Sequence, residues 1–318
     1  MSVPKGDFEV EVVSVQPVAD GVVAIELAGR GGSALPAWTP GAHIDLVLPS
    51  GLVRQYSLAG DPAASTWRLG VLNEPAGRGG SRWVTERMKP GSVLGAVGPR
   101  NHFAGDPAST APLVLIAGGI GVTPILPMAA AAALAGREFR LHYAGHEGRM
   151  GFVDELEAAH GDRLALHVSE AGARLDVAAL VAAAAADGAE IVCCGPARLI
   201  DEVVAEGAAA GVDVTVERFE ANALTAPLWD APFEVELTLT GVTVEVPVDR
   251  SILEVAEEAG ALVLSSCTEG TCGTCETPVL EGEVDHRDSI LSPSQRARND
   301  TMFVCVSRAA CARLVLEL

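Results

Sequence analysis

The chain has 318 residues, of which 49% are hydrophobic, and it carries 42 acidic against 22 basic residues for a formal net charge of −20. This length suits two or three domains, and the apolar fraction is too high for a disordered chain. The acidity argues against a nucleic-acid-binding protein, because that function needs clustered Lys and Arg. It is compatible with a basic protein partner, or simply with an acidic surface that keeps the protein in solution.

The apolar segments and the cysteines bear on the cellular location. No apolar run approaches the roughly 20 residues of a membrane span, and the first residues lack the apolar core of a secretory signal. The seven cysteines are an odd number, which argues against a disulfide framework and for metal binding by some of them and burial of others. We therefore expect a cytoplasmic protein.

The first third of the chain predicts an antiparallel β-barrel. Short β-rich runs are separated by Gly, Pro and Asp, as in barrels built from consecutive short strands. The expected strands cover residues 8–15, 21–27, 43–48, 54–59 and 68–73.

Two segments of this region have the chemistry of a flavin site. In RQYSL (54–58), the arginine can pair with a phosphate, the tyrosine can pack on the ring or its side chain, and the serine can approach the N5 edge. The loop GRGGS (77–81) precedes a predicted helix over 83–88, so its bare N–H groups can bind an anion. Either segment alone is also compatible with an ordinary strand or turn, and their combination carries the prediction.

The middle of the chain predicts a parallel sheet covered on both faces. Continuous apolar strands alternate with helices, which is typical of that architecture. Strands are expected at 111–119, 138–145, 163–170, 189–196 and 212–219, and helices at 123–136, 151–161, 175–185 and 197–211.

Two loops of this region have the chemistry of a nucleotide site. The segment AGGIGVTP (117–124) joins a strand to a helix, and its glycines permit close approach of a pyrophosphate. Thr123 can cap that helix and Pro124 suits its first position. The segment CGP (194–196) ends a later strand, where ligands of parallel sheets bind. Cys193 should face the opposite side of that strand and be buried, and Cys194 is either a pocket residue or a second buried thiol.

The last part of the chain predicts a separate small domain. Residues 221–232 have no periodicity and contain two prolines, as a linker does. A hairpin over 233–248, a short helix over 251–260 and a final strand over 312–318 follow, and we expect Cys311 to be a small buried hydrophobe in that strand.

Four cysteines of this part have the ligand spacing of a plant-type 2Fe–2S cluster. Cys267-x4-Cys272-x2-Cys275 is followed after 29 residues by Cys305. Gly270 and Gly273 allow the loop to wrap closely round inorganic sulfide. A zinc site is the alternative, but zinc sites usually have a second paired knuckle, which is absent here.

Residues 233–318 resemble a plant-type ferredoxin, and the chain from about residue 8 onward resembles the phthalate dioxygenase reductase and vanillate demethylase reductase family. The resemblance implies a flavin barrel (1–108), a nicotinamide α/β domain (109–226) and an α+β, β-grasp-like ferredoxin domain (227–318). It also implies FMN rather than FAD, the outer iron on Cys267 and Cys272, and the inner iron on Cys275 and Cys305. The implied flavin and nicotinamide residues are Arg54, Tyr56, Ser57, Leu58, Val71, Asn73, Gly79, Gly80, Ser81, Gly118, Gly119, Gly121, Thr123, Cys194, Gly195 and Pro196.

Two further details follow from the resemblance. An aromatic residue at the end of the α/β domain lies near the flavin in this family, so Phe219 has either that role or the role of an ordinary strand residue. Where many relatives carry Arg, this chain has His146, followed by Glu147; both disfavour a 2′-phosphate and favour NADH, although Arg149 leaves NADPH open.

The resulting hypothesis is an electron relay. NADH supplies two electrons to FMN, and the 2Fe–2S cluster passes them singly to a separate Rieske-type oxygenase or demethylase, with no acid–base residue required. The acceptor would dock near the acidic ferredoxin domain, where Pro227 to Leu318 contain 16 acidic residues against 6 arginines. The alternatives are a reductase for a haem-thiolate monooxygenase or another acceptor, and a redox sensor of low turnover.

Overall fold

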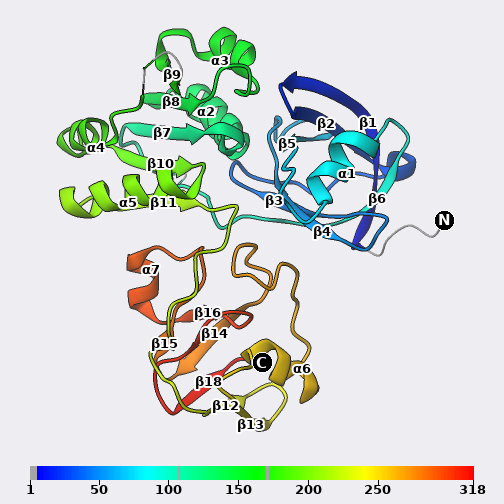
Figure 1. The fold of residues 1–318 in the computed structure, drawn as a ribbon, viewed down its shortest axis with the longest axis vertical. Coiled ribbons are helices and arrows are strands. Elements are labelled where there is room, and N and C mark those ends of the chain that lie inside the picture. The colour runs from blue at the N-terminus through cyan, green and yellow to red at the C-terminus, as the bar shows by residue number, and fades with distance from the viewer. Residues whose placement is uncertain (1–5, 107, 170–171, 173) are drawn as a thin grey trace. The chain divides into compact units, whose positions relative to one another are not determined.

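The computed structural model describes residues 6–106, 108–169, 172 and 174–318 (Figure 1). The chain divides into two compact units, Met1–Glu217 and Arg218–Leu318, which are described separately below. No helix in the described ranges is long and apolar enough to cross a membrane.

The first part of unit 1 is a six-stranded antiparallel sheet with strand order β4-β3-β6-β1-β2-β5. Alternate side chains point inward, so Val10, Val12, Ile25 and Leu27 are almost completely buried in its core. The predicted barrel is therefore confirmed, and the structure adds one strand, β6, which was not among the expected runs. The elements are β1 Phe8–Ala19, β2 Val22–Gly29, η1 Arg30–Gly32, β3 His43–Val47, β4 Val53–Ser57, β5 Trp67–Leu72, α1 Gly80–Arg87 and β6 Val93–Arg100.

The second part of unit 1 is a five-stranded parallel sheet with strand order β11-β10-β7-β8-β9. Helices α2 and α3 pack on one face, while α4 and α5 pack on the other, which explains why the inner strands are apolar on both sides. The predicted strand over 163–170 is β9, but Glu170 lies outside the described residues. The elements are β7 Leu113–Gly118, η2 Gly119–Gly121, α2 Val122–Leu134, β8 Phe139–Gly145, α3 Val153–His160, η3 Gly161–Arg163, β9 Leu164–Val168, α4 Val177–Ala186, β10 Glu190–Cys194, α5 Ala197–Ala210 and β11 Val214–Glu217.

The barrel and the α/β part of unit 1 share a packed boundary. Ala24 and Ala59 of the barrel belong to the same hydrophobic cluster as Val122 and Ile125 of α2. At Gly70 the approach is so close that a Cβ would lie 2.5 Å from Cγ2 of Thr123. Strand β5 therefore lies directly against the beginning of α2.

Unit 2 contains a mixed five-stranded sheet with strand order β13-β12-β18-β14-β16, and a two-stranded ladder of β15 and β17. β12 pairs antiparallel with β13 and parallel with β18, so the terminal strand is inserted beside the hairpin. The predicted hairpin and helix are both present. The elements are β12 Phe233–Leu237, β13 Val242–Val246, α6 Ile252–Glu258, β14 Glu276–Glu281, β15 Val284–Asp285, α7 Pro293–Arg298, β16 Thr301–Phe303, β17 Arg308–Ala309 and β18 Arg313–Leu316.

The predicted linker, residues 221–232, contains no helix or strand, but it is tied to unit 2. The N–H of Asn222 donates to Ser289 Oγ at 2.8 Å, and the N–H of Leu228 donates to Asp285 Oδ2 at 3.2 Å. Arg287 donates to the carbonyl of Thr225. These bonds hold the segment along the surface of the unit to which it leads.

The expectation for Cys311 was wrong about the strand and about full burial. Cys311 precedes β18 rather than lying in it, and it is only partly buried. Its sulfur lies 3.2 Å from the N–H of Glu283 and 3.0 Å from the carbonyl of Arg313. The side chain packs against the hydrophobic core of unit 2, and its sulfur also contacts these two backbone groups.

Candidate functional site

The two segments with flavin chemistry lie next to each other in the barrel. Arg54 on β4 crosses the start of α1, and a Cβ at Gly80 would lie 2.6 Å from Arg54 Nε. Arg54 also donates to the carbonyls of Val53 at 2.7 Å and Arg78 at 3.5 Å. Gly79 adopts a left-handed backbone, with φ 86°, and gives α1 no side-chain cap. A guanidinium beside the uncapped N–H groups of a helix is suited to a phosphate.

Polar atoms without partners occur among the predicted flavin residues. The Tyr56 hydroxyl and Asn73 Oδ1 are buried and have no hydrogen-bond partner in the structure. Burial raises the pKa of Tyr56 to about 12, so this phenol stays neutral and can donate. Buried polar groups are normally satisfied, so these two atoms fit a site that a polar ligand completes.

The remaining predicted barrel residues have more ordinary surroundings. Leu58 and Val71 are buried in the barrel core. Ser81 Oγ accepts the N–H of Glu74 at 3.1 Å, which fixes the loop before α1. These residues shape the barrel edge and expose no reactive group.

The two loops with nucleotide chemistry meet at the carboxyl edge of the parallel sheet. β7 and β10 are neighbours in the sheet, with Cys194 in register with Ala117. A Cβ on Gly121 would lie 2.3 Å from the Cys194 carbonyl oxygen, and one on Gly195 would lie 2.9 Å from the Cα of Gly118. Only glycine permits this approach of the two backbones. Thr123 Oγ1 donates back to the Ile120 carbonyl at 2.9 Å and so closes the turn.

Cys193 and Cys194 point to opposite faces of β10, as the strand geometry predicts. Cys193 packs in the cluster beneath α4 and α5, and Cys194 packs in the cluster beneath α2. Burial, with smaller effects of Glu217 and Cys193, raises the pKa of Cys194 well above its ordinary value. The thiol therefore stays protonated and contributes shape rather than charge.

Sequence reasoning missed Glu217, which joins the flavin and nicotinamide segments. It ends β11 beside Cys194, and its Oε2 accepts the Ser57 hydroxyl at 3.0 Å. His43 Nδ1 on β3 lies 3.8 Å from its Oε1. Burial raises the pKa of Glu217 to about 8, against the lowering effect of the Ser57 hydrogen bond. The carboxyl is thus largely protonated at neutral pH. In the sequence, the only local sign of this role is that a charged residue ends an apolar strand.

The four predicted cluster cysteines lie together in unit 2. Cys272, Cys275 and Cys305 are buried, while Cys267 is partly exposed. The N–H groups of Glu269 and Thr271 point at Cys267 Sγ from 3.3 and 3.5 Å. The pKa of Cys267 lies well below its usual value, first because of contacts with Cys272 and Cys305 and then because of these N–H groups. The same contacts raise the pKa of Cys272 and Cys305, so among the four thiols it is Cys267, with two N–H groups aimed at it, where negative charge is favoured.

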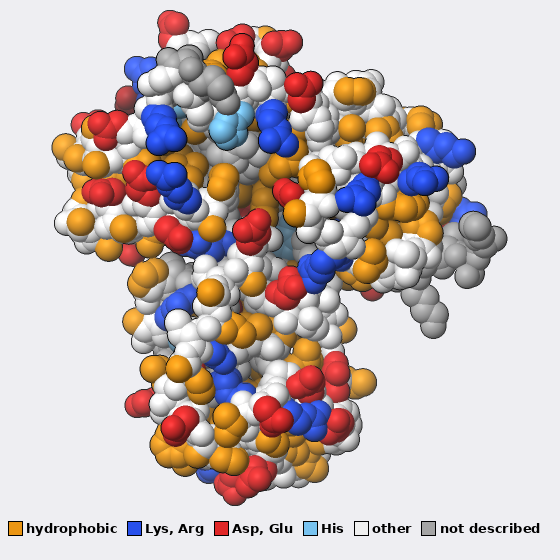
Figure 2. Space-filling view, in the orientation of Figure 1, with side chains coloured by type: hydrophobic (Ala, Val, Ile, Leu, Met, Phe, Trp, Pro, Cys, Tyr) orange, Lys and Arg blue, Asp and Glu red, His pale blue; other side chains and the backbone are white. Residues whose placement is uncertain are grey.

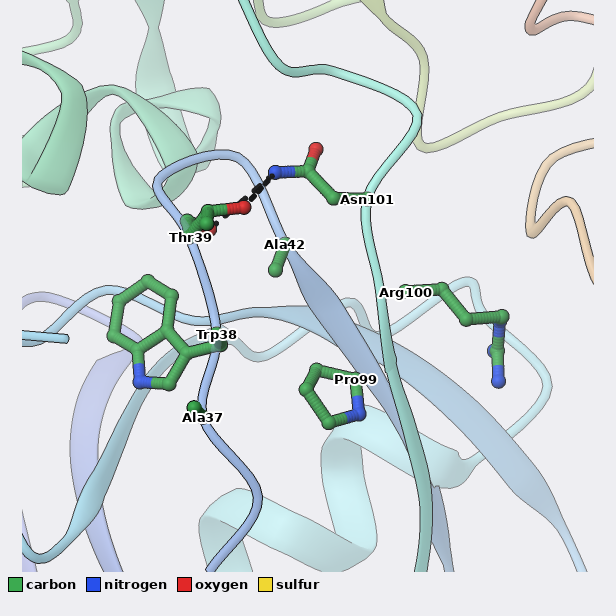
Figure 3. Close-up of a pocket in the computed structure, with 7 residues that line it drawn as sticks. All are labelled: Ala37, Trp38, Thr39, Ala42, Pro99, Arg100 and Asn101. Carbon is green, nitrogen blue, oxygen red and sulfur yellow. Dashed lines mark hydrogen bonds between the residues drawn. The ribbon is translucent and has the colours of Figure 1, made fainter. Parts of the chain in front are cut away.

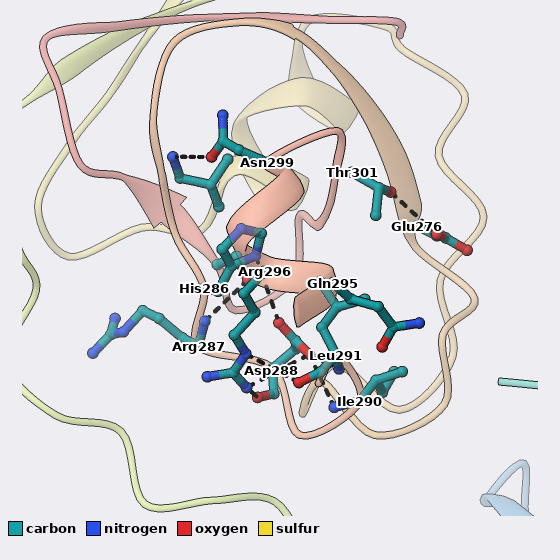
Figure 4. A network of polar contacts seen from close by, with 12 residues as sticks. Glu276, His286, Arg287, Asp288, Ile290, Leu291, Gln295, Arg296, Asn299 and Thr301 are labelled. Atoms are coloured by element: carbon teal, nitrogen blue, oxygen red, sulfur yellow. Dashed lines mark hydrogen bonds and ion pairs between the residues drawn. The ribbon is translucent and has the colours of Figure 1, made fainter. Parts of the chain in front are cut away.

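A polar network around Asp288 (Figure 4) fixes the turn that supports the cluster loop, residues 265–276. Asp288 Oδ1 accepts the N–H groups of Ile290 and Leu291 at 2.9 and 2.7 Å, and Arg296 donates to the Asp288 carbonyl at 2.6 Å. The next residue in this turn, Ser289, donates its N–H to the carbonyl of Gly270 at 2.9 Å. Gly270 has φ 73°, and a Cβ there would lie 2.6 Å from Val306 Cγ2. Glycine is therefore required where the loop turns.

A surface hollow of about 250 Å³ lies elsewhere on the barrel (Figure 3). Among the described residues, the buried indole Nε1 of Trp38 has no hydrogen-bond partner. Asn101 bridges to Thr39 Oγ1 at 2.8 Å across the hollow. None of the site residues predicted from the sequence lines it; the lining is Ala37, Trp38, Thr39, Ala42, Pro99, Arg100 and Asn101.

Sequence comparisons identify relatives along the whole chain. Residues 235–311 match the family model of the 2Fe–2S iron–sulfur cluster binding domain. The putative toluene-4-sulfonate monooxygenase system reductase subunit of Comamonas testosteroni is 41% identical over 98% of this chain and 99% of its own. The vanillate O-demethylase oxidoreductase of a Pseudomonas strain is 38% identical over 98% of this chain and 100% of its own.

A solved structure belongs to the same group of reductases. Phthalate dioxygenase reductase, described as a modular structure for electron transfer from pyridine nucleotides to 2Fe–2S, is 33% identical over the full length of both chains, with a TM-score of 0.69. The chain belongs to the phthalate dioxygenase reductase and vanillate demethylase reductase family.

This family accounts for the three kinds of domain, and the chain is an oxidoreductase with a flavin, a nicotinamide and a 2Fe–2S site. This chain also matches the solved structure of an intact self-sufficient cytochrome P450 monooxygenase, with 38% identity and a TM-score of 0.90. That match covers 98% of this chain but only 41% of the P450 chain.

Proposed function

We propose that this reductase takes electrons from NADH through FMN to its 2Fe–2S cluster and delivers them to a separate Rieske-type oxygenase or demethylase. A bound flavin supplies the step between a two-electron donor and a one-electron acceptor. The protein contributes the positions of the cofactors and the surroundings that set their potentials. In this proposal electrons enter at the α/β domain (109–226), pass to the flavin of the barrel (1–108) and leave through the ferredoxin domain (227–318).

The observation that carries the proposal is the hydrogen bond between Ser57 and Glu217. Ser57 ends the strand with flavin chemistry, and Glu217 lies in register with Cys194 at the nicotinamide loops. The two cofactor segments, 160 residues apart, thus share one edge of unit 1. A nicotinamide and a flavin placed there would meet in a region lined by neutral buried groups.

The choice of FMN is supported by the geometry of the barrel at Arg54 and the start of α1. Arg54 and the uncapped start of α1 suit one phosphate, which is what FMN carries. The proposed contacts with the rest of the flavin are Tyr56, Ser57 and Asn73. For NADH, the support is the exposed loop after β8, which carries His146 and Glu147; Arg149 in the same loop keeps NADPH as the alternative.

The proposed ligands of the cluster are Cys267, Cys272, Cys275 and Cys305. Their spacing, the backbone N–H groups aimed at Cys267 and the rigid loop suit an anionic iron–sulfur group. None of the seven cysteines, all within the described ranges, forms a disulfide, which is compatible with the reducing cytoplasm that we propose as the location.

The proposal also names the class of the electron acceptor. Relatives named as reductases of monooxygenase and demethylase systems support an oxygenase partner. A haem-thiolate acceptor is the second candidate, favoured by the similarity to the reductase portion of a self-sufficient P450. Reduction assays with a Rieske oxygenase and with a P450 as acceptors would separate the two.

The proposal is tested by cofactor extraction and rapid mixing of the purified protein. We expect FMN, together with about two iron and two sulfide per chain as a plant-type cluster requires. NADH should bleach the flavin band first and the cluster band next. Extraction of FAD would refute the flavin assignment, and slow or absent bleaching by NADH would support a redox sensor instead.

A further inference from the structure

The segment that leads into the cluster loop, residues 261–265, presents two leucines to solvent. Leu262 is 99% exposed and Leu264 is 78% exposed, which is unusual for large apolar side chains so close together. The intervening Val263 packs against the core of unit 2, and Ala261 is buried in it. An extended segment directs alternate side chains to opposite sides. The inward pair therefore anchors the backbone and fixes the direction of the outward pair.

These two leucines, which we call the leucine pair, adjoin the accessible part of the cluster site. The segment ends two residues before Cys267, the one predicted ligand that is not buried. A protein that covered the leucine pair would therefore lie beside the one predicted ligand that reaches the surface. Covering exposed apolar side chains of this size with a partner protein would gain the favourable free energy of removing them from water.

The surroundings of the leucine pair are acidic. Helix α6 carries Glu254, Glu257 and Glu258 on its exposed side, and Glu269 and Glu276 follow in the cluster loop and at the start of β14. Figure 2 shows acidic side chains gathered on the α6 side of unit 2. Arg250, which pairs with Glu258 at 2.7 Å, neutralises only part of this charge. An apolar centre with a charged rim is the usual anatomy of a protein interface.

We propose that the leucine pair is the apolar centre of the docking surface for the electron-accepting protein, and that this acceptor offers an apolar recess bordered by Lys or Arg. The inference rests on the proposed function and adds the contact residues. A second copy of this chain is disfavoured as the occupant, since its unit 2 carries the same excess of 16 acidic residues over 6 arginines between Pro227 and Leu318.

The test is the double variant Leu262→Gln/Leu264→Gln, with Leu239→Gln as the matched control. Leu239 is 75% exposed in the hairpin turn after β12, outside the proposed surface. The acceptors are cytochrome c, a basic haem protein that takes single electrons, and ferricyanide, a small anion. We expect the double variant to raise KM for cytochrome c about tenfold, which corresponds to about 1.4 kcal/mol. The control should stay at the wild-type value, and NADH–ferricyanide turnover should be the same in all three proteins.

Three results would overturn the inference. The first is an unchanged KM for cytochrome c in the double variant. The second is slower flavin-to-cluster transfer in stopped-flow traces, which would assign the leucine pair to a contact within the chain. The third is a dimer in gel filtration that only the double variant loses, which would assign the surface to a second copy. Failure of the proposed function is distinguishable, because then wild-type cluster would not be reduced by NADH at all.

Discussion

The Glu217→Gln substitution should make the stability of unit 1 less dependent on pH. Burial raises the pKa of Glu217 to about 8 in the folded protein, whereas its value in an unfolded chain is 4.5. Between these values the folded state holds one proton more than the unfolded state. The free energy of unfolding of the wild type therefore falls as pH rises: the contribution is complete below pH 4.5 and is lost by the time pH has passed about 8.

The size of the effect follows from the same shift. Each pKa unit corresponds to about 1.4 kcal/mol, so the full window amounts to roughly 4 to 5 kcal/mol. This is an upper limit, because 14% of the Glu217 side chain reaches solvent. Glutamine has the shape of a protonated glutamate, and its amide oxygen can still accept the Ser57 hydroxyl. The difference in free energy of unfolding between the variant and the wild type should therefore grow in favour of the variant from about pH 5 to about pH 8, and stay constant above that pH.

The assay is urea unfolding followed by tryptophan fluorescence, repeated at steps of about one pH unit. A Trp229→Phe background leaves Trp38, Trp67 and Trp83, all in unit 1, so the signal reports that unit. Glu202→Gln, on the exposed face of α5, is the matched control and should run parallel to the wild type. If Glu217→Gln also runs parallel across this range, the buried carboxyl is not neutral and the reasoning fails.

Three other substitutions, the last with a matched control, test the cofactor sites. Arg54→Ala should weaken flavin binding roughly 10- to 100-fold, since a charge-assisted hydrogen bond is lost, and an unchanged Kd in a fluorescence titration would contradict the phosphate role. Gly121→Ala should destabilise unit 1 by about 1–3 kcal/mol, because its Cβ would lie 2.3 Å from the Cys194 carbonyl oxygen; thermal unfolding measures this, and a wild-type Tm would count against the close approach. Cys305→Ser should abolish the visible and EPR signals of the cluster while Cys311→Ser keeps them, and a cluster retained in the first variant would exclude Cys305 as a ligand.

Local patterns were sufficient for much of the architecture. The hairpin over 233–248 was predictable because alternation of apolar and polar residues reports a sheet with one buried face. The continuous apolar strand 113–118 likewise indicated a sheet covered on both sides. The prediction was wrong in placing Cys311 inside the final strand and in expecting full burial: it precedes β18 and packs against the core while only partly buried.

The sequence by itself determined the cluster motif, because four ligands at fixed spacing are a local property of one loop and one later cysteine. It also predicted the flavin and nicotinamide segments one by one, each from its own local pattern. Only the tertiary structure decided that Ser57 and Glu217, 160 residues apart, share a hydrogen bond, and that Glu217 is neutral. The physical reason is that the pKa of a carboxyl depends on how far the fold removes it from water. The residues that do so here are distant in the sequence, so the segment around Glu217 does not predict the shift.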